Sequence, residues 1–186
     1  MIDFASDSAT ITNNFWSLEM SYEFALYKNS DGTLRKRGLI SEQLVKGGVN
    51  CLKLDLWDDD DFQGSLYIAQ DTTGSIRTIG HNMVGEPEWI YPNSAGTIIT
   101  NNPVIGEEYY STINFGLNGE KRTVVAVDET VTISQGTFTD CVKIKLTGWG
   151  HPEWVDYAWY CPDYGWIKWE ENNISTGWQE ISEFRP

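Results

Sequence analysis

Hydrophobic and polar residues alternate along most of this chain with the period of two that is typical of β-strands. In residues 15–28, FWSLEMSYEFALYK, every second residue from Trp16 to Leu26 is apolar, and the intervening residues are Ser, Glu and Ala. Alternation over so long a run predicts a strand with one buried face. The NSDG segment 29–32 predicts a turn, and LRKRGLISEQLV predicts the returning strand.

Further strand patterns follow to the end of the chain, separated by Gly, Asn and Asp turns. They cover residues 51–57, 65–70, 75–80, 96–100, 107–115, 121–127, 129–134, 137–149, 155–161, 165–171 and 176–184. No segment has the apolar stripe of an amphipathic helix. We therefore predict an all-β fold with little or no helix, in a single domain spanning residues 1–186.

About ten antiparallel strands in one sheet do not stay flat, because each strand twists. The sheet is expected to curve into a half-barrel, or β-clam, whose concave face must be filled. With no helix in the pattern, large side chains or a ligand must fill it.

Charge restricts the partners of this chain. The net charge is −14 and the pI is about 4.4, and the longest basic cluster is Arg35-Lys36-Arg37. Binding to nucleic acid or to anionic membrane surfaces requires many clustered cations, so the charge argues strongly against nucleic acid and disfavours anionic membrane surfaces. No apolar run approaches the roughly 20 residues of a membrane-spanning helix. The start MIDFASDSAT does not resemble a signal peptide, which indicates either a cytosolic chain or a mature domain with an added Met.

Few residues suggest catalysis or metal binding. The WDDDDF turn, residues 57–62, gathers carboxylates, but its spacing does not fit a calcium loop. His81 and His151 lie far apart, and no nucleophile motif is present. We expect no catalytic residue, no metal site and no cofactor. Paired carboxylates of an acidic hydrolase remain an alternative in so acidic a chain.

The tryptophans are the strongest candidates for a binding site. Six of the nine lie between residues 149 and 178. Aromatic rings on a sheet can stack on sugars, hold an apolar molecule or pack a core. Adjacent residues point to opposite faces of a strand, so Trp159 and Tyr160 must point apart, as must Trp166 and Ile167. The candidate ligand-binding residues are Trp16, Met20, Tyr22, Phe24, Tyr157, Trp159, Trp166 and Trp169.

The three cysteines allow at most one intramolecular disulfide. Cys141 and Cys161 flank a predicted hairpin, in which the numbers of opposed residues have a constant sum. A sum of 302 places the two cysteines opposite each other, whereas 303 places Val142 opposite Cys161 and Ile144 opposite Trp159. Apolar matching favours 303, which puts the cysteines on opposite faces and prevents a bond. A bulge at Asp140–Cys141 would restore contact, and a Cys51–Cys141 pair remains an alternative.

Four segments resemble one known group of proteins. They are IAQDTTGSIRTIG at 68–80, EPEWIYP at 86–92, ETVTISQGTFTDCVKIKL at 129–146 and AWYCPDYGWIKWE at 158–170. Their turn-centred motifs are similar to those of uncharacterised exported proteins and lipoproteins of bacteria, a domain of unknown function. Cys161 and Asp163-Tyr164 depart from that pattern.

The resemblance implies a β-clam related to lipoprotein carriers, located outside the cytoplasm, whose leader is absent from this sequence. We expect a non-enzymatic protein that binds an apolar small molecule in its concave face. A carbohydrate-binding module is the alternative, with a glycan as its partner.

Overall fold

The described part of the chain consists of β-strands and connecting turns. The computed structural model describes residues 2–4, 10–12, 15, 17–28, 32–91, 93, 96–111, 120–148, 151–173 and 178–184. These residues form fifteen strands and no α-helix, which confirms the all-β prediction. None of them forms a helix that can cross a lipid bilayer.

The strands follow one another along the chain with short connections. They are β1 (Thr10–Thr12), β2 (Ser17–Glu19), β3 (Glu23–Lys28), β4 (Leu34–Lys46), β5 (Val49–Asp58), β6 (Asp61–Gln70), β7 (Ile76–Met83), β8 (Trp89–Ile90), β9 (Gly96–Ile99), β10 (Glu108–Ser111), β11 (Glu120–Ile133), β12 (Gly136–Gly148), β13 (His151–Cys161), β14 (Gly165–Asn173) and β15 (Trp178–Phe184).

Thirteen of these strands belong to one antiparallel sheet. Its order is β10-β11-β12-β13-β14-β15-β3-β4-β5-β6-β7-β8, and β9 also pairs with β7. Only β1 and β2 lie outside it among the described strands, as a separate pair. The sheet is a meander within each half of the chain, and the pairing of β15 with β3 joins the two halves.

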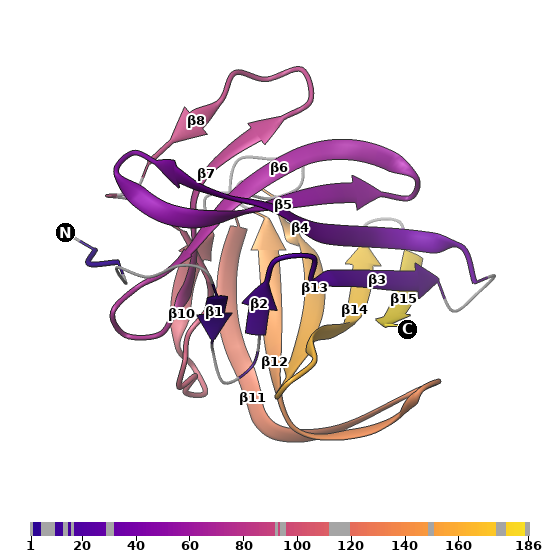
Figure 1. Ribbon diagram of the computed structural model, residues 1–186. Helices are drawn as coiled ribbons and strands as arrows, with labels where there is room; N and C mark the ends of the chain where they lie inside the picture. Colours follow the sequence, from indigo (N-terminus) through magenta and orange to yellow (C-terminus); the bar gives the residue numbers. More distant parts are fainter. Residues whose placement is uncertain are drawn as a thin grey trace.

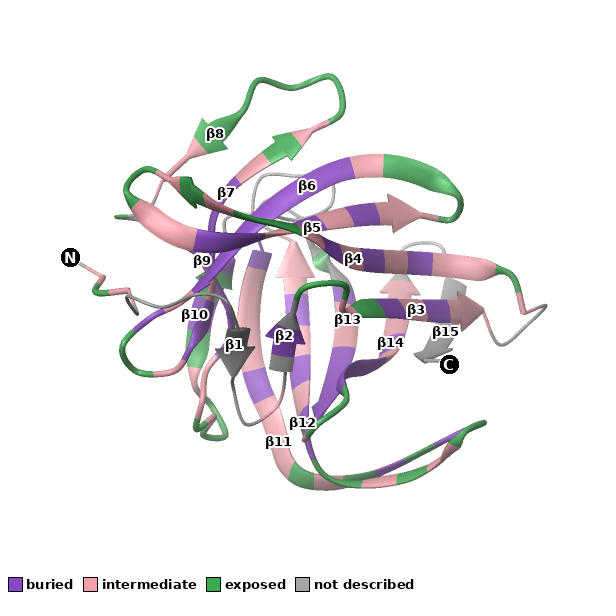
Figure 2. Ribbon diagram, in the orientation of Figure 1, coloured by how far each residue is buried: buried purple, intermediate pink, exposed green. Residues whose placement is uncertain are grey.

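The two halves of the sheet pack face to face. In Figure 1, β10–β14 stand nearly upright and β3–β7 cross in front of them at a steep angle. One cluster of buried side chains draws on both halves, including Phe24, Leu54 and Ile68 from the first and Ile144 and Trp169 from the second. Figure 2 shows the buried residues alternating with less buried ones along the strands. The predicted curved sheet is therefore present, with its concave face enclosed between its own halves.

The alternating residues 15–28 are predicted to form a single strand, but the structure divides them. They form β2 and β3, separated by a turn at Met20 and Ser21, and Ser21 has a φ of 67°. A left-handed residue changes the direction of the chain, which period-two alternation does not reveal. Met20 is consequently 43% exposed. Conversely, the predicted strands 121–127 and 129–134 form one strand, β11, with register shifts around Asp128.

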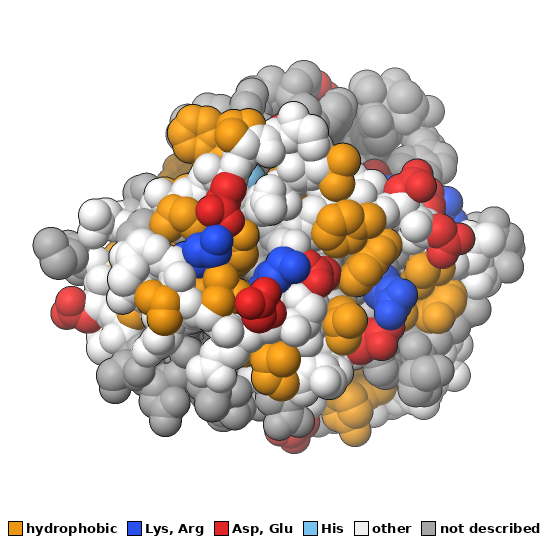
Figure 3. All heavy atoms as spheres, turned by 45° about the horizontal axis from the view of Figure 1, so that its top comes forward, with side chains coloured by type: hydrophobic (Ala, Val, Ile, Leu, Met, Phe, Trp, Pro, Cys, Tyr) orange, Lys and Arg blue, Asp and Glu red, His pale blue; other side chains and the backbone are white. Residues whose placement is uncertain are grey.

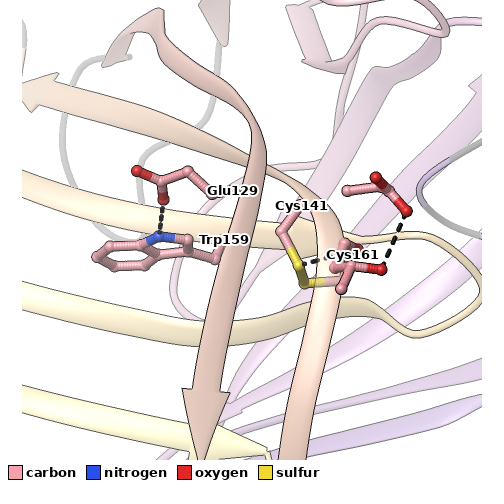
Figure 4. Close-up of a disulfide and its surroundings, with 6 residues drawn as sticks. Glu129, Cys141, Trp159 and Cys161 are labelled. Carbon is pink, nitrogen blue, oxygen red and sulfur yellow. Dashed lines mark hydrogen bonds between the residues drawn. A yellow bond between two sulfur atoms is a disulfide. The ribbon is translucent and has the colours of Figure 1, made fainter.

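The register of β12 and β13 corrects the prediction for the cysteines. Val142 pairs with Tyr160 and Ile144 with Ala158, a sum of 302, so the favoured sum of 303 is wrong. Cys141 and Cys161 form a disulfide, which also excludes the Cys51–Cys141 alternative (Figure 4). The described cysteine that remains free is Cys51, which is buried.

Apolar matching failed because both faces of these strands are packed. Lys143 pairs with Trp159, and its Nζ lies 4.6 Å from the centroid of that ring and 4.4 Å from that of Tyr157. A lysine across from an aromatic ring is a favourable cation–π pair, not a mismatch. The correct register therefore places Lys143 and Lys145 opposite aromatic residues on one face. On the other face, Val142 and Ile144 lie opposite Tyr160 and Ala158.

Candidate binding cavity

A cavity of about 210 Å³ lies between the two halves of the sheet. The half that contains β3–β9 contributes Phe24, Arg35, Lys36, Leu54, Leu56, Asp58, Leu66, Thr78 and Ile98. The half that contains β10–β15 contributes Ser111, Glu120, Arg122, Leu146, Asp156, Ala158, Tyr160, Trp166, Trp169 and Glu171. Its wall is mainly apolar, with charged groups at several points.

Aromatic rings form one side of the cavity. The centroid of Trp166 lies 5.4 Å from that of Phe24 and 6.4 Å from those of Tyr160 and Trp169. Phe24 reaches this position because its ring covers Gly38, where an added Cβ would lie 2.2 Å from the Phe24 Cε1. The four rings are each less than 10% exposed, which makes this side of the cavity rigid and apolar.

A register shift places both Trp166 and Trp169 in the cavity. Residues three apart in a regular strand point to opposite faces. Between β13 and β14, however, Trp159 pairs with Lys168 and Tyr160 with Trp166, so Ile167 is an extra residue. Ile167 packs in the cluster on the outer face with Trp159, as adjacent-residue alternation predicts. The irregularity therefore adds a second tryptophan to the cavity wall.

Two cations from β4 enter the cavity beside Trp169. The Lys36 Nζ lies 4.0 Å from the centroid of the Trp169 ring and 3.5 Å from Asp58 Oδ1. Burial lowers the pKa of Lys36, and Arg35 lowers it further against the effect of Asp58. Arg35 donates to Asp58 and to Glu171 Oε2 at 3.1 Å. Burial acts to lower the pKa of Arg35, but Asp58 and Glu171 raise it overall.

A third cation, Arg122, comes from β11. Its Nε donates to Glu120 Oε1 at 2.6 Å and its Nη1 donates to the backbone oxygen of Ile98 at 2.7 Å. The Ile98 contact crosses from one half of the sheet to the other. Burial works against the charged form, but Glu120 and neighbouring tyrosines raise the pKa of Arg122 overall. The ion pair is thus held in place with its charges intact.

Asp156 differs from the other carboxylates of the cavity because no described cation forms an ion pair with it. It lies at the centre of β13, opposite Leu146 on one side and Glu171 on the other. The backbone N–H of Asn172 donates to its Oδ1 at 3.1 Å. Burial, together with Glu171 and Glu120, raises the pKa of Asp156 to about 6. Its carboxyl group therefore changes protonation near neutral pH.

One hydroxyl in the cavity wall has no partner. Thr78 is 1% exposed, and its Oγ1 forms no hydrogen bond with any described residue. A buried hydroxyl left without a hydrogen bond costs about 1–3 kcal/mol. Thr78 belongs to β7, so this group and Asp156 belong to opposite halves of the sheet.

The candidate residues from the sequence divide between several places. Phe24, Trp166 and Trp169 line the cavity. Tyr22 is half-buried, packs beside the main core and donates from its hydroxyl to the backbone oxygen of Tyr164 at 3.2 Å. Met20 is exposed at its turn. Trp16 lies outside the described residues, as do the side chains of His151, Trp154 and Trp178 and the whole of Trp149.

Tyr157 and Trp159 lie on the face of the sheet opposite the cavity. Trp159 is 5% exposed and packs on the disulfide and Ile167. Its Nε1 donates to Glu129 Oε2 at 2.8 Å, as Figure 4 shows beside the disulfide. Glu129 belongs to β11, so this bond holds the long β11–β12 hairpin against the outer face. The position of Trp159 leaves little of its ring for a sugar to stack on.

The remaining candidate groups are involved in local structure. In the WDDDDF turn, Asp58 and Asp59 face Arg35, and Asp59 also lies 3.7 Å from Lys28. His81 lies 3.3 Å from the Tyr91 hydroxyl, and burial lowers its pKa. Among the described residues, no group of three His, Cys, Asp or Glu is arranged to hold a metal ion.

The surface drawn in Figure 3 carries charges of both signs. Basic side chains lie next to acidic ones on this face, with apolar side chains between them. Such mixing gives this face no continuous basic strip for a phosphate backbone.

Most charged residues of the cavity were not predicted as site residues, although the sequence contains a signal for some of them. Lys36 alternates with Gly38 and Ile40, which are buried, and Asp156 alternates with Ala158 and Tyr160. A charged residue in phase with a buried series predicts an inward-pointing charge. To use this signal for Asp156, one must know which face of β13 points inward. The predicted sum of 303 assigned the two faces of β13 wrongly.

Comparisons with known proteins support the fold. No protein-family profile and no curated protein sequence matches this chain. The fold is similar to that of a proposed exported protein with a YmcC-like fold from Bacteroides fragilis, with a TM-score of 0.51 and 16% identity, over 93% of this chain and 98% of that one. A proposed lipoprotein from Parabacteroides distasonis matches with a TM-score of 0.41 and 13% identity, over 94% and 96%. At this identity, the first similarity shows a shared all-β architecture.

Proposed function

We propose that this chain is an exported binding protein that holds a small, largely apolar molecule between the two halves of its sheet. The cavity is the observation that carries the proposal. At about 210 Å³ it exceeds the ~150 Å³ of an engineered protein cavity that binds benzene. Its aromatic side is fixed by mutual ring packing, so the wall is formed before a ligand arrives.

Two observations support a location outside the cytoplasm. Disulfides persist mainly in oxidising compartments, and Cys141 and Cys161 are bonded. The similar fold from Bacteroides fragilis belongs to a proposed exported protein. Fractionation of the native host tests the location, since recovery of the chain in the cytosolic fraction contradicts it.

Native mass spectrometry of protein purified from its own host tests ligand binding. The proposal predicts a non-covalent adduct that is lost when the protein unfolds. An Ala158→Leu variant prepared in the same way is the matched control, because a larger side chain at this wall position takes up cavity space. A bare mass for the wild type, together with a collapsed cavity in a crystal structure, contradicts the proposal.

A second candidate, an acidic hydrolase, has one observation in its favour. Asp156 and Glu171 form a cross-strand pair in the cavity wall, and the raised pKa of Asp156 suits a general acid. Glu171 is, however, engaged by Arg35. Hydrolysis of aryl glycosides that disappears in Asp156→Asn favours this candidate, and absence of turnover across such a panel contradicts it.

A further inference from the structure

The charges of the cavity do not balance. Three cations, Arg35, Lys36 and Arg122, and four carboxylates, Asp58, Glu120, Asp156 and Glu171, line it. Arg122 pairs with Glu120, while Arg35 and Lys36 share Asp58 and Glu171. With all seven groups charged, the cavity has an excess of one negative charge. An uncompensated buried charge is costly, which favours a ligand that brings a positive charge.

Two polar groups of the wall are available to such a ligand. The Asn172 N–H occupies Asp156 Oδ1, and Asp156 Oδ2 has no hydrogen-bond partner among the described residues. From the opposite half of the sheet, Thr78 contributes a buried hydroxyl without a partner. A carboxylate and a hydroxyl both accept hydrogen bonds, and a protonated amine is a donor only. Both groups can therefore accept hydrogen bonds from an ammonium group, whereas the buried Nε of Arg35, which also has no partner, is a donor that such a ligand leaves unused.

The aromatic wall already stabilises one ammonium group. Lys36 Nζ lies over the Trp169 ring at 4.0 Å from its centroid, within the range of a cation–π interaction. Trp169 lies opposite Ala158, the next inward residue of β13 after Asp156, and Tyr160 with Trp166 extends the aromatic wall beyond it. An organic amine placed here keeps its apolar part against aliphatic and aromatic side chains.

Resting on the proposed function, we infer that the ligand is a small organic cation, a protonated amine with an apolar body, and that Asp156 is its counter-ion. An anionic ligand is disfavoured because each of the three lining cations already forms an ion pair with a carboxylate of the wall. A neutral ligand fills the cavity but leaves the negative charge of the Asp156 carboxylate without a counter-ion. A bare metal ion does not use the apolar wall.

Isothermal titration calorimetry with three probes of similar size tests this inference. The probes are 2-phenylethylamine, 2-phenylethanol and phenylacetate, at pH 7.5. We expect the amine to bind at least tenfold more tightly than the alcohol, and the carboxylate to bind most weakly. In Asp156→Asn, the advantage of the amine over the alcohol should disappear. Asp61→Asn, at an exposed carboxylate outside the cavity, should retain it.

Each other outcome is also decisive. Binding of the alcohol with equal or greater affinity overturns the amine inference and leaves the binding function in place. Survival of the amine preference in Asp156→Asn overturns the role of Asp156. No heat from any probe contradicts the inference and the proposed function together. If Asp156→Asn does not fold, Thr78→Val replaces it, and an undiminished affinity for the amine in that variant contradicts the inferred position of the ammonium group.

Discussion

Asp156 and Glu171 lie directly opposite each other in the pairing of β13 with β14, and both line the cavity. Like charges at directly opposed positions destabilise a sheet. The pair persists because Arg35 donates to Glu171, while the raised pKa of Asp156 keeps part of its carboxyl population neutral near pH 6. A partly buried pair of carboxylates that weakens the fold points to a role in binding.

The first prediction concerns pH and stability. The pKa of Asp156 is about 6 in the folded chain, against an ordinary value of 3.8. A carboxyl with a raised folded pKa contributes stability that is fully present below the unfolded value and is lost as pH rises through the folded one. Asp156→Asn removes this loss, so it should stabilise the protein by on the order of 2 kcal/mol at pH 8 and change little at pH 4.

Urea unfolding at pH 4, 6 and 8 measures this effect. The groups that face Asp156 also contribute to its titration, namely Glu171 on β14, Lys36 on β4 and Glu120 on β11. Asp61→Asn, at an exposed carboxylate, is the control and should show no such pH dependence. A variant Asp156→Asn that is less stable than wild type at pH 8 would falsify the assignment.

The second prediction concerns the three cysteines. In denaturant without reductant, one thiol, that of Cys51, should react with iodoacetamide, and three should react after reduction. The bond closes a loop with a sequence separation of 20, so the Cys141→Ser, Cys161→Ser double variant should lose roughly 3 kcal/mol of stability. Mass spectrometry counts the labels, and three labels before reduction contradict the disulfide.

The third prediction compares two buried alanines. Ala158 lines the cavity, whereas Ala69 packs in a separate cluster on the other face of β6 and lines no part of it. Ala158→Leu should fold with little loss of stability because its side chain extends into free volume. Ala69→Leu should cost about 1–3 kcal/mol through overpacking. Thermal unfolding distinguishes them, and an equal loss in both variants indicates that the cavity does not exist in solution.

The fourth prediction separates the two faces of the sheet. Trp159→Phe keeps an aromatic ring but removes the donor to Glu129. A hydrogen bond to a charged acceptor contributes about 1.5–3 kcal/mol, so the variant should be less stable by roughly that amount. Since Trp159 lies outside the cavity, affinity for 2-phenylethylamine should be unchanged. Lower affinity in this variant, measured under conditions where it is fully folded, would place the site on the wrong face.

Part of this structure follows directly from the alternating sequence. The returning strand after Lys28 and the short strand at Gly96–Ile99 appear as predicted, and no described residue belongs to an α-helix. These features depend on local periodicity and turn residues. The break at Ser21, the shift at Ile167 and the register of β12 with β13 depend on how both faces of a strand pack, which alternation along one segment does not specify.

The composition of the cavity was harder to predict for the same reason. Phe24, Trp166 and Trp169 were expected from their aromatic character, whereas Tyr157 and Trp159 belong to the other face of their strand. A shift of one residue in register exchanges the two faces of a strand. The wrong register therefore assigned Tyr157, in place of Asp156, to the face that lines the cavity. The Arg35–Glu171 ion pair and the hydrogen bond from Arg122 to the backbone oxygen of Ile98 connect distant strands, and no sequence spacing predicts them.

The most direct test of the cavity as a binding site is a ¹H–¹⁵N spectrum of the tryptophan indoles during titration with 2-phenylethanol, a neutral probe. The signals of Trp166 and Trp169, in the cavity wall, should shift with saturation. The signal of Trp159, on the opposite face, is an internal control and should stay in place. Shifts confined to Trp159, or none at saturating probe, would contradict a ligand between the two halves of the sheet.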